Sequence, residues 1–288
     1  MTHPDVSHRF GTLGVWLLRS LPTEQLTRVT REVETLGYGA VWISGGKDPG
    51  IFDVVETVLD ATERITVATG IVNLWAETPE SVTDAWHRLE ARHPGRLHVG
   101  LGVSHKPMVE GLLGLEYTRP LARTREFLDG LDAQPDPLPV ERRLIGALGP
   151  KMLQLSAART LGAHPYLVTT HNTEQARAEV GDGVVAVELG VVLDGDVDSA
   201  RATAREQIAR YFGMPNYTNN WLRSGFTEAD LADGGSDALI EALVAIGDVD
   251  AVAARVAEHR AAGADHVALQ VLGADPDYVA AFTALAGS

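Results

Sequence analysis

One glycine-rich segment of the 288-residue chain has the residue types of an anion site. Gly146-Ala-Leu-Gly-Pro-Lys151 ends an apolar run and opens an amphipathic one. Gly149 lets the backbone approach a ligand closely, and Pro150 presets the start of a helix. Free N–H groups at that helix N-terminus, with the helix dipole and Lys151, would attract a phosphate. An ordinary turn between a strand and a helix also uses Gly-Pro, so both interpretations stay open.

A second glycine closes the β-branched run that begins at Ile65. A glycine where a barrel strand meets its loop often marks a bulge or a close approach of the backbone to a ligand. If Gly70 has that role, Asn73 and Trp75 face the ligand. The alternative is relief of strand twist beside a core tryptophan.

Histidines could move protons near two of the expected strands. His105 follows Ser104 where the fourth strand meets solvent, and an imidazole there can exchange a proton at neutral pH. A lone loop histidine is more often simply solvated. His164 and His171 surround a later strand, but no H-E-x-x-H or H-x-H spacing indicates a metal site, so we expect no bound metal.

Aromatic and amide side chains gather late in the chain. The stretch from Asn216 to Phe226 includes Tyr217, Trp221 and Arg223. It lies within Gly213–Asp237, a long connection that we expect to be an ordered lid, because long loops in compact domains are often functional. Such a surface could cover an apolar ring or form a contact between subunits.

The elements that must position these residues alternate along the chain. Short apolar runs rich in β-branched residues switch with longer amphipathic segments, which is typical of βα units and a parallel sheet. Eight strands are predicted: Leu13–Leu18, Ala40–Ser44, Ile65–Val72, Leu97–Val103, Arg143–Ala147, Pro165–Thr169, Val184–Leu193 and His266–Leu272. Helices are predicted to begin at Pro22, Pro79, Pro120, Pro150, Val197, Val249 and Pro276.

We therefore expect an α/β fold, a single (β/α)8 TIM barrel formed by residues 1–288, with an insertion at about 213–238 between strands 7 and 8. The length suits such a barrel, and no shift in composition marks a domain boundary. An open doubly wound sheet is the alternative. In a barrel, function lies on the loops after the carboxyl ends of the strands.

Composition and charge exclude several classes of protein. The chain has 24 basic and 39 acidic residues, a net charge of −15, and no cysteine. It therefore has neither a disulfide framework nor a cysteine nucleophile, and it lacks the basic stripe expected of a nucleic-acid or anionic-membrane surface. Because neither a secretory signal nor a membrane-spanning run is recognisable, we expect a cytoplasmic protein.

Several motifs together resemble the luciferase-like monooxygenase superfamily, and within it the actinobacterial oxidoreductases that depend on the deazaflavin coenzyme F420. The resemblance covers nearly the whole chain. It is carried by Leu13-Gly-Val-Trp16, Thr69-Gly-Ile-Val72, Arg96 to His105, Ala147-Leu-Gly-Pro-Lys-Met152, Gly162-Ala-His-Pro-Tyr166, Asn216-Tyr-Thr-Asn-Asn220 and His259 to His266. The last three are the most specific.

The resemblance implies an enzyme that transfers a hydride between F420 and a small organic substrate. It implies a cis peptide bond between Gly70 and Ile71 at the back of the ring, and a phosphate loop at Ala147 to Pro150. The cofactor-binding residues it implies are Ser44, Gly70, Ile71, Val72, Asn73, Gly102, Ser104, Ala147, Leu148, Gly149, Pro150, Lys151, Gly162, Ala163 and His164. His105 is the candidate catalytic residue, although a sugar-phosphate dehydrogenase branch has glutamate at this position.

The rest of the active site is less determined by the resemblance. Trp16, Trp75, Tyr217 and Trp221 are the expected walls of the substrate pocket, and a homodimer is expected because relatives are commonly dimers. Relatives often have an acidic or histidine side chain where the second strand ends, whereas this chain has Ser44. FMN is therefore the alternative cofactor. The alternative functions are an FMN-dependent monooxygenase and a non-catalytic flavin-binding barrel.

Overall fold

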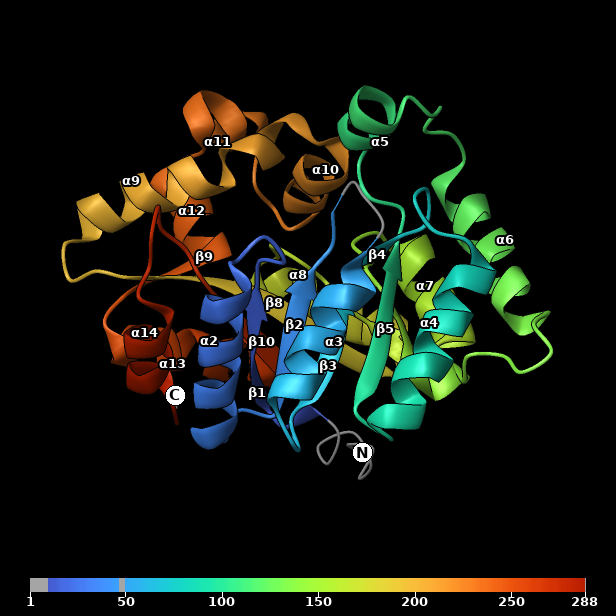
Figure 1. Ribbon diagram of the computed structural model, residues 1–288. Helices are drawn as coiled ribbons and strands as arrows, with labels where there is room; N and C mark the ends of the chain where they lie inside the picture. The colour runs from blue at the N-terminus through green and yellow to red at the C-terminus, as the bar shows by residue number, and fades with distance from the viewer. Residues whose placement is uncertain (1–9, 47–49, 288) are drawn as a thin grey trace.

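The fold is a closed barrel of eight parallel strands. The computed structural model describes residues 10–46 and 50–287, and the strands point toward the top of Figure 1. The barrel strands are β1 (Leu13–Leu17), β2 (Ala40–Ser44), β3 (Thr66–Gly70), β5 (Leu97–Gly102), β6 (Arg143–Ile145), β7 (Gly162–Ala163), β8 (Val184–Leu193) and β10 (His266–Val271). Because β10 pairs with both β8 and β1, the ring closes. The predicted barrel is confirmed, and the open sheet is excluded.

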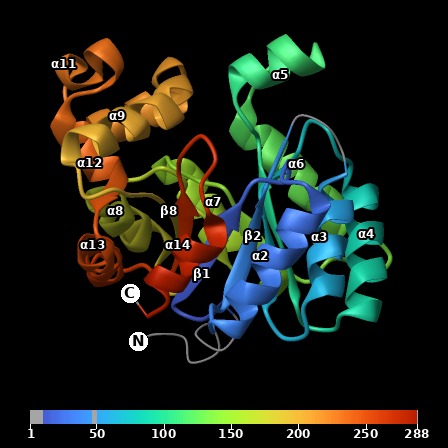
Figure 2. The ribbon, with the colours of Figure 1, turned by 60° about the vertical axis from the view of Figure 1, so that its left-hand side comes forward.

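Helices surround the barrel and continue above it. They are α2 (Thr23–Thr35), α3 (Ile51–Ala61), α4 (Pro79–Arg92), α5 (Lys106–Leu113), α6 (Pro120–Asp132), α7 (Pro150–Arg159), α8 (Thr170–Val180), α9 (Val197–Ile208), α10 (Pro215–Arg223), α11 (Glu228–Leu231), α12 (Asp237–Leu243), α13 (Val249–Ala261) and α14 (Tyr278–Leu285). In Figures 1 and 2, α5 and α11 lie beyond the same ends of the strands. Within the described ranges, no helix is long and apolar enough to cross a membrane.

The start of α4 illustrates how local sequence sets these boundaries. Thr78 accepts a hydrogen bond from the Ser81 N–H at 3.2 Å, and the Ser81 hydroxyl accepts one from the Thr78 N–H at 3.1 Å. Pro79 occupies the first helical position, where a missing N–H costs nothing. This reciprocal cap is why the predicted start at Pro79 is confirmed.

The predicted strand Pro165–Thr169 is wrong. The sixth barrel strand is Gly162–Ala163, which pairs with β6 and β8. Pro165 has no N–H to donate to a sheet, and Leu167 has a positive φ of 53°, so the chain leaves the barrel there. Thr169 then caps α8, because its hydroxyl accepts from the Asn172 N–H at 3.1 Å.

Other differences lie at the bulge and in the insertion. The predicted strand Ile65–Val72 divides into β3 and β4 (Val72–Asn73) at the Gly70–Ile71 bond, and this bond is cis as the resemblance implied. The expected loop Gly213–Asp237 is largely helical, since it contains α10 and α11. An unpredicted strand, β9 (Val244–Gly247), pairs with the far end of β8 outside the ring.

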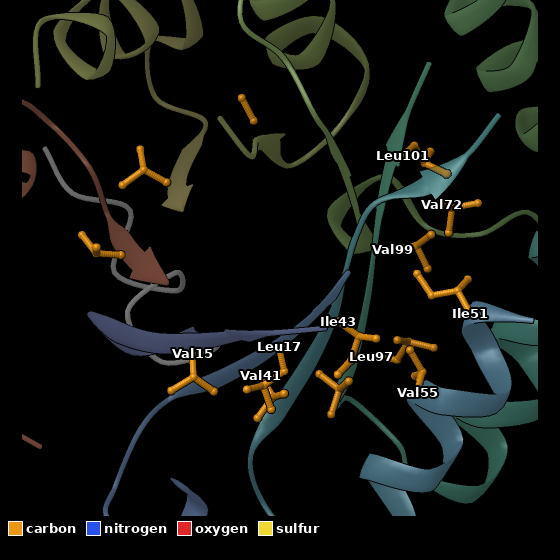
Figure 3. Close-up of a cluster of buried hydrophobic side chains, with 14 of the residues drawn as sticks. Val15, Leu17, Val41, Ile43, Ile51, Val55, Val72, Leu97, Val99 and Leu101 are labelled. Atoms are coloured by element: carbon orange, nitrogen blue, oxygen red, sulfur yellow. The ribbon is translucent and has the colours of Figure 1, made fainter. Parts of the chain in front are cut away.

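Alternate residues of each strand serve two different cores. Val15, Leu17, Val41 and Ile43 belong to the large outer cluster between the sheet and the helices, part of which Figure 3 shows together with Val55 of α3. Residues of the other parity form a separate cluster in the barrel interior, whose members include Trp16, Trp42, Ala68, Ala186 and Ala268. The period of two thus separates packing outside the sheet from packing inside it.

The barrel interior is aromatic and polar. Trp42 stacks on His164 with ring centroids 4.0 Å apart, and its Nε1–H donates to His266 Nε2 at 3.0 Å. His266 Nδ1 donates to the Gly11 carbonyl at 3.0 Å, so its ring is neutral and fully paired. Burial of such a histidine is stable only when its ring is neutral, because an imidazolium charge would lose its hydration.

We expect the free energy of unfolding to fall as the pH is lowered from about 6.5 toward 4. Burial lowers the pKa of His105, His164, His259 and His266 to about 4, whereas unfolded histidines titrate near pH ~6.5. The unfolded state therefore binds four protons that the folded state does not bind. Burial raises the pKa of Glu188 to about 8, and this opposite contribution offsets one proton. The net slope is about 4 kcal/mol per pH unit.

Urea unfolding at several pH values in this window checks the expectation. His259→Gln is the matched variant, because His259 lies between α13 and α8, where Thr173 is its hydrogen-bond partner at 2.9 Å. The variant should lose about one proton from the slope, or ~1.4 kcal/mol per pH unit. An unchanged slope in this variant, or stability that does not fall with pH, would contradict the assignment.

Candidate functional site

A cavity of about 600 Å³ lies at the carboxyl ends of the strands. The loops after β1, β2, β3, β5 and β6 form its floor and sides, and α10 with the turn before it covers it. This is the end of a barrel where ligands bind. Among the described residues, no group of histidines and carboxylates could hold a metal ion.

The bulge at Ile71 explains two of the neighbouring glycines. A Cβ added at Gly102 or Gly146 would lie 2.8 or 3.2 Å from the Ile71 side chain, whereas a Cβ added at Gly100 would lie 2.1 Å from the Thr69 carbonyl oxygen. Gly102 and Gly146 therefore leave room for Ile71, and Gly100 leaves room for the backbone of β3. Gly70 and Ile71 both line the cavity.

Three polar atoms at the cavity have no partner in the described part of the chain. They are Trp16 Nε1, Asn73 Nδ2 and His164 Nε2, on side chains that are at most 5% exposed. His164 Nδ1 donates to the Ala186 carbonyl at 2.7 Å, which leaves Nε2 as an acceptor. Asn73 Oδ1 accepts from the Trp75 N–H at 3.1 Å, which leaves Nδ2 as a donor.

Two of these atoms lie close together beside Gly70. A Cβ added at Gly70 would lie 2.7 Å from Trp16 Nε1 and 3.2 Å from His164 Nε2. A donor and an acceptor thus approach one point at the edge of the bulge. Because buried polar groups are normally paired, this arrangement suits a ligand with polar atoms of both kinds.

The anion site predicted at the start of α7 has an open approach. Gly149 caps α7 with extended backbone, and the nearest atom to an added Cβ is Arg223 Nη2, 3.8 Å away. Ala147, Leu148 and Gly149 line the cavity. Lys151 instead lines a surface groove with Arg125 and Arg159. The positive side chain next to this helix N-terminus is therefore Arg223 of the lid.

His105 joins the fourth-strand loop to the lid. Its Nδ1 accepts a hydrogen bond from Asn216 Nδ2 at 3.2 Å, and its ring lies 5.3 Å from that of Tyr217. Burial lowers the pKa of His105 to about 4, with the Arg210 charge acting in the same direction. At neutral pH the ring is neutral, so its Nε2–H can donate to a ligand.

A chain of hydrogen bonds leads from the turn before the lid, Ala209–Gly213, to the barrel strand β10. Arg210 donates to the Tyr211 hydroxyl at 2.7 Å, Tyr211 donates to Tyr166 at 3.1 Å, and Tyr166 donates to Gln270 Oε1 at 2.8 Å. The ring of Tyr217 packs at 4.8 Å from that of Tyr211.

Sequence reasoning named Tyr217 of this cluster as a pocket wall, but it missed Arg210, Tyr211 and the buried Glu188. Glu188 is 1% exposed, and its Oε2 accepts from the Leu167 N–H at 2.9 Å. A usable signal existed, because Glu188 is the single carboxylate in the apolar run Val184–Leu193. Nothing comparable marked Tyr211 or Arg210.

Most of the predicted site residues meet at the cavity. Its lining includes Trp16, Ser44, Gly70, Ile71, Asn73, Gly102, Ser104, His105, Ala147, Leu148, Gly149, His164 and Tyr217. Outside that lining are Val72, Trp75, Pro150, Lys151, Gly162, Ala163 and Trp221.

The two tryptophans outside the lining serve structural contacts. Trp221 is fully buried in the core of the insertion, where its Nε1–H donates to the Leu167 carbonyl at 3.2 Å. Trp75 donates to the Val103 carbonyl at 2.9 Å and packs beside Tyr117. Tyr117 itself lines the cavity, and sequence reasoning missed it as well.

Comparison with known proteins adds a sequence relative and two solved structures. A coenzyme F420-dependent oxidoreductase, by its name, of Mycobacterium tuberculosis is 23% identical, and the alignment covers 87% of this chain and 91% of the relative. An F420-dependent secondary alcohol dehydrogenase, solved with an F420–acetone adduct, superposes with a TM-score of 0.75 at 14% identity, over 93% of this chain and 95% of that chain.

The oxygenating constituent of 3,6-diketocamphane monooxygenase from Pseudomonas putida, solved with FMN, has a TM-score of 0.65 at 15% identity, over 96% of this chain and 95% of that chain. At these identities the solved structures establish the fold. The family is established by sequence, since the model of the luciferase-like monooxygenase family matches residues 10–266. The chain, with its cavity at the carboxyl ends of the barrel strands, therefore belongs to the luciferase-like monooxygenase family.

Proposed function

We propose that this chain is an oxidoreductase that binds coenzyme F420 in the cavity and transfers a hydride between the coenzyme and a small organic substrate. The observation that carries the proposal is the set of unpaired atoms Trp16 Nε1, Asn73 Nδ2 and His164 Nε2. The names of the Mycobacterium tuberculosis relative and of the secondary alcohol dehydrogenase support the choice of coenzyme.

The unpaired atoms fit the polar edge of a deazaflavin ring. That edge has two carbonyl oxygens with a ring N–H between them, and so needs donors and an acceptor. Trp16 and Asn73 offer donors, and His164 offers the acceptor. Each buried polar atom that stays unpaired costs about 1–3 kcal/mol, which a ring with this edge would recover.

Bound there, the coenzyme supplies hydride chemistry at C5 of its ring, and the chain supplies position and electrostatics. Gly70 and Ile71 back the ring. The N-terminus of α7 and Arg223 hold the phosphate. Tyr217 and Met214 of the lid cover the substrate and exclude water. His105 donates its Nε2–H to a polar group of the substrate.

An FMN-dependent monooxygenase is the second candidate. FMN has the same polar edge and a phosphate, and the 3,6-diketocamphane monooxygenase structure with FMN supports this alternative.

Spectral titration of the purified protein with F420 and with FMN tests the choice of coenzyme. We expect F420 to bind at least about tenfold more tightly, a difference of ~1.4 kcal/mol. Exclusive or equal binding of FMN would contradict the proposal. Oxygen consumption with reduced FMN would favour the monooxygenase.

Replacing Trp16 with Phe should separate cofactor binding from stability. The variant keeps an aromatic ring but removes the unpaired Nε1–H. We expect cofactor affinity to fall about tenfold, and the free protein to unfold no more easily, because an unsatisfied buried donor is removed. Spectral titration and urea unfolding measure the two quantities. A stability loss with unchanged affinity would assign Trp16 to packing alone.

Replacing Gly149 with Val should weaken cofactor binding without unfolding the protein. The backbone at Gly149 is extended, with φ −93° and ψ 155°, so valine can adopt it. Its side chain would occupy the approach to the N-terminus of α7, and we expect an affinity loss of about tenfold or more. Gly195→Val is the control, since a Cβ at Gly195 meets nothing within 4 Å. Unchanged affinity at Gly149 would place the phosphate elsewhere.

A further inference from the structure

The cavity lining is positively charged, whereas the chain as a whole is negatively charged. The whole chain has a net charge of −15. Yet the described residues that line the cavity include Arg19, Arg210 and Arg223, and among them is neither an aspartate nor a glutamate. The described lining of the cavity is therefore positively charged in a protein that is acidic overall.

Arg210 and Arg223 mark two different places. Arg223 ends α10 and lies next to Gly149, at the proposed phosphate site. Arg210 lies before α10, above the ring of Tyr211 at 4.8 Å, and Tyr211 packs against Tyr217 near the start of that helix. Six residues of helix separate Tyr217 from Arg223, about 9 Å. The two guanidinium groups therefore have different neighbours, Gly149 for Arg223 and Tyr211 for Arg210.

Arg210 has donors left over for a ligand. Its Nη2 donates to the Tyr211 hydroxyl at 2.7 Å, and within the described ranges no carboxylate lies within 4 Å of it. Neighbouring arginines behave differently, because Arg201 and Arg205 are paired with Glu241 and Asp237. A guanidinium group offers five N–H donors in a planar fork that suits a carboxylate.

We infer that Arg210 binds the carboxylate of the substrate, and that the substrate class of this enzyme is the small organic acids. This inference rests on the proposed function, because it takes the cavity as the active site, and it goes beyond that function by naming the substrate class. The Tyr211 hydroxyl accepts a hydrogen bond from the guanidinium group and holds it in place. Asn216 and the neutral His105 also line the cavity and offer polar contacts without negative charge.

Glu188 is the carboxyl group nearest in effect to Arg210 and its neighbours. Its charge would raise the pKa of Tyr166, Tyr211 and Tyr217. It lacks a basic partner within 4 Å among the described residues, and burial raises its pKa to about 8. At neutral pH it is uncharged and does not repel an anion. Above pH 8 it ionises, while the pKa of Tyr166 and Tyr217 stays well above 10, His105 is already neutral and Arg210 stays charged.

Calorimetric titration with benzoate and benzamide tests the inference. The two probes have nearly the same size and shape, but only benzoate is an anion. At pH 7 we expect benzoate to bind about tenfold or more tightly than benzamide. Arg210→Gln should abolish that difference, and Arg210→Lys should keep part of it. Melting temperatures establish that each variant is folded. Equal binding of the two probes to the unchanged protein would overturn the inference.

Two further variants separate this site from general electrostatics and from the phosphate site. Arg28→Gln removes the same charge from the exposed face of α2, and should keep the preference for benzoate. Arg223→Gln should also keep it, while weakening cofactor binding. Loss of the preference in Arg28→Gln, or in Arg223→Gln but not Arg210→Gln, would overturn the inference.

A pH series adds a signature that a purely structural arginine would not give. We expect the preference for benzoate to weaken between pH 7 and 9 in the unchanged protein and to stay constant in Glu188→Gln. A pH dependence that persists in Glu188→Gln would overturn the proposal that ionised Glu188 weakens the binding of benzoate. Failure of the proposed function is seen separately, as a lack of F420 binding in the spectral titration, which these probes do not report.

Discussion

The stack of Trp42 on His164 determines what the cavity floor offers to a ligand. Because Trp42 gives its N–H to His266 and His164 gives its Nδ1–H to the Ala186 carbonyl, one atom of this network, His164 Nε2, is left without a partner. The closed barrel prevents these side chains from turning elsewhere. The acceptor at the floor is therefore a consequence of packing in the barrel interior, and it exists before any ligand binds.

The sign of the charge differs between the outer surface and the cavity. The outer surface is acidic, whereas the cavity presents the N-terminus of α7, Arg223 and Arg210. A strongly acidic surface protects solubility but repels an anionic ligand, so the attraction has to be local. In the arrangement that we propose, the N-terminus of α7 would attract one anion, and Arg210, just before the lid, would bind another. The buried Glu188 fits this scheme because its proton keeps it neutral.

Much of the fold could be predicted from the sequence, since hydrophobic period and helix caps are local signals. The strands around Trp42 and Val99 and the helix start at Pro79 are examples. The sixth strand could not, because two residues of Gly162–Ala163 pair only when the neighbouring strands are in place. Within the site, Gly149 and His164 followed from their motifs, whereas Arg210 and Tyr211 reach the cavity through the turn Ala209–Gly213 that precedes the insertion.

A crystal structure of the complex with F420 tests the proposed site most directly. We expect the polar edge of the ring within hydrogen-bond distance of Trp16 Nε1 and His164 Nε2, and the phosphate at the N-terminus of α7 beside Arg223. Arg210 should remain free of the coenzyme and face the space above the ring. A ring that leaves His164 Nε2 unpaired, or a phosphate bound by Arg210, would contradict the arrangement proposed for this cavity.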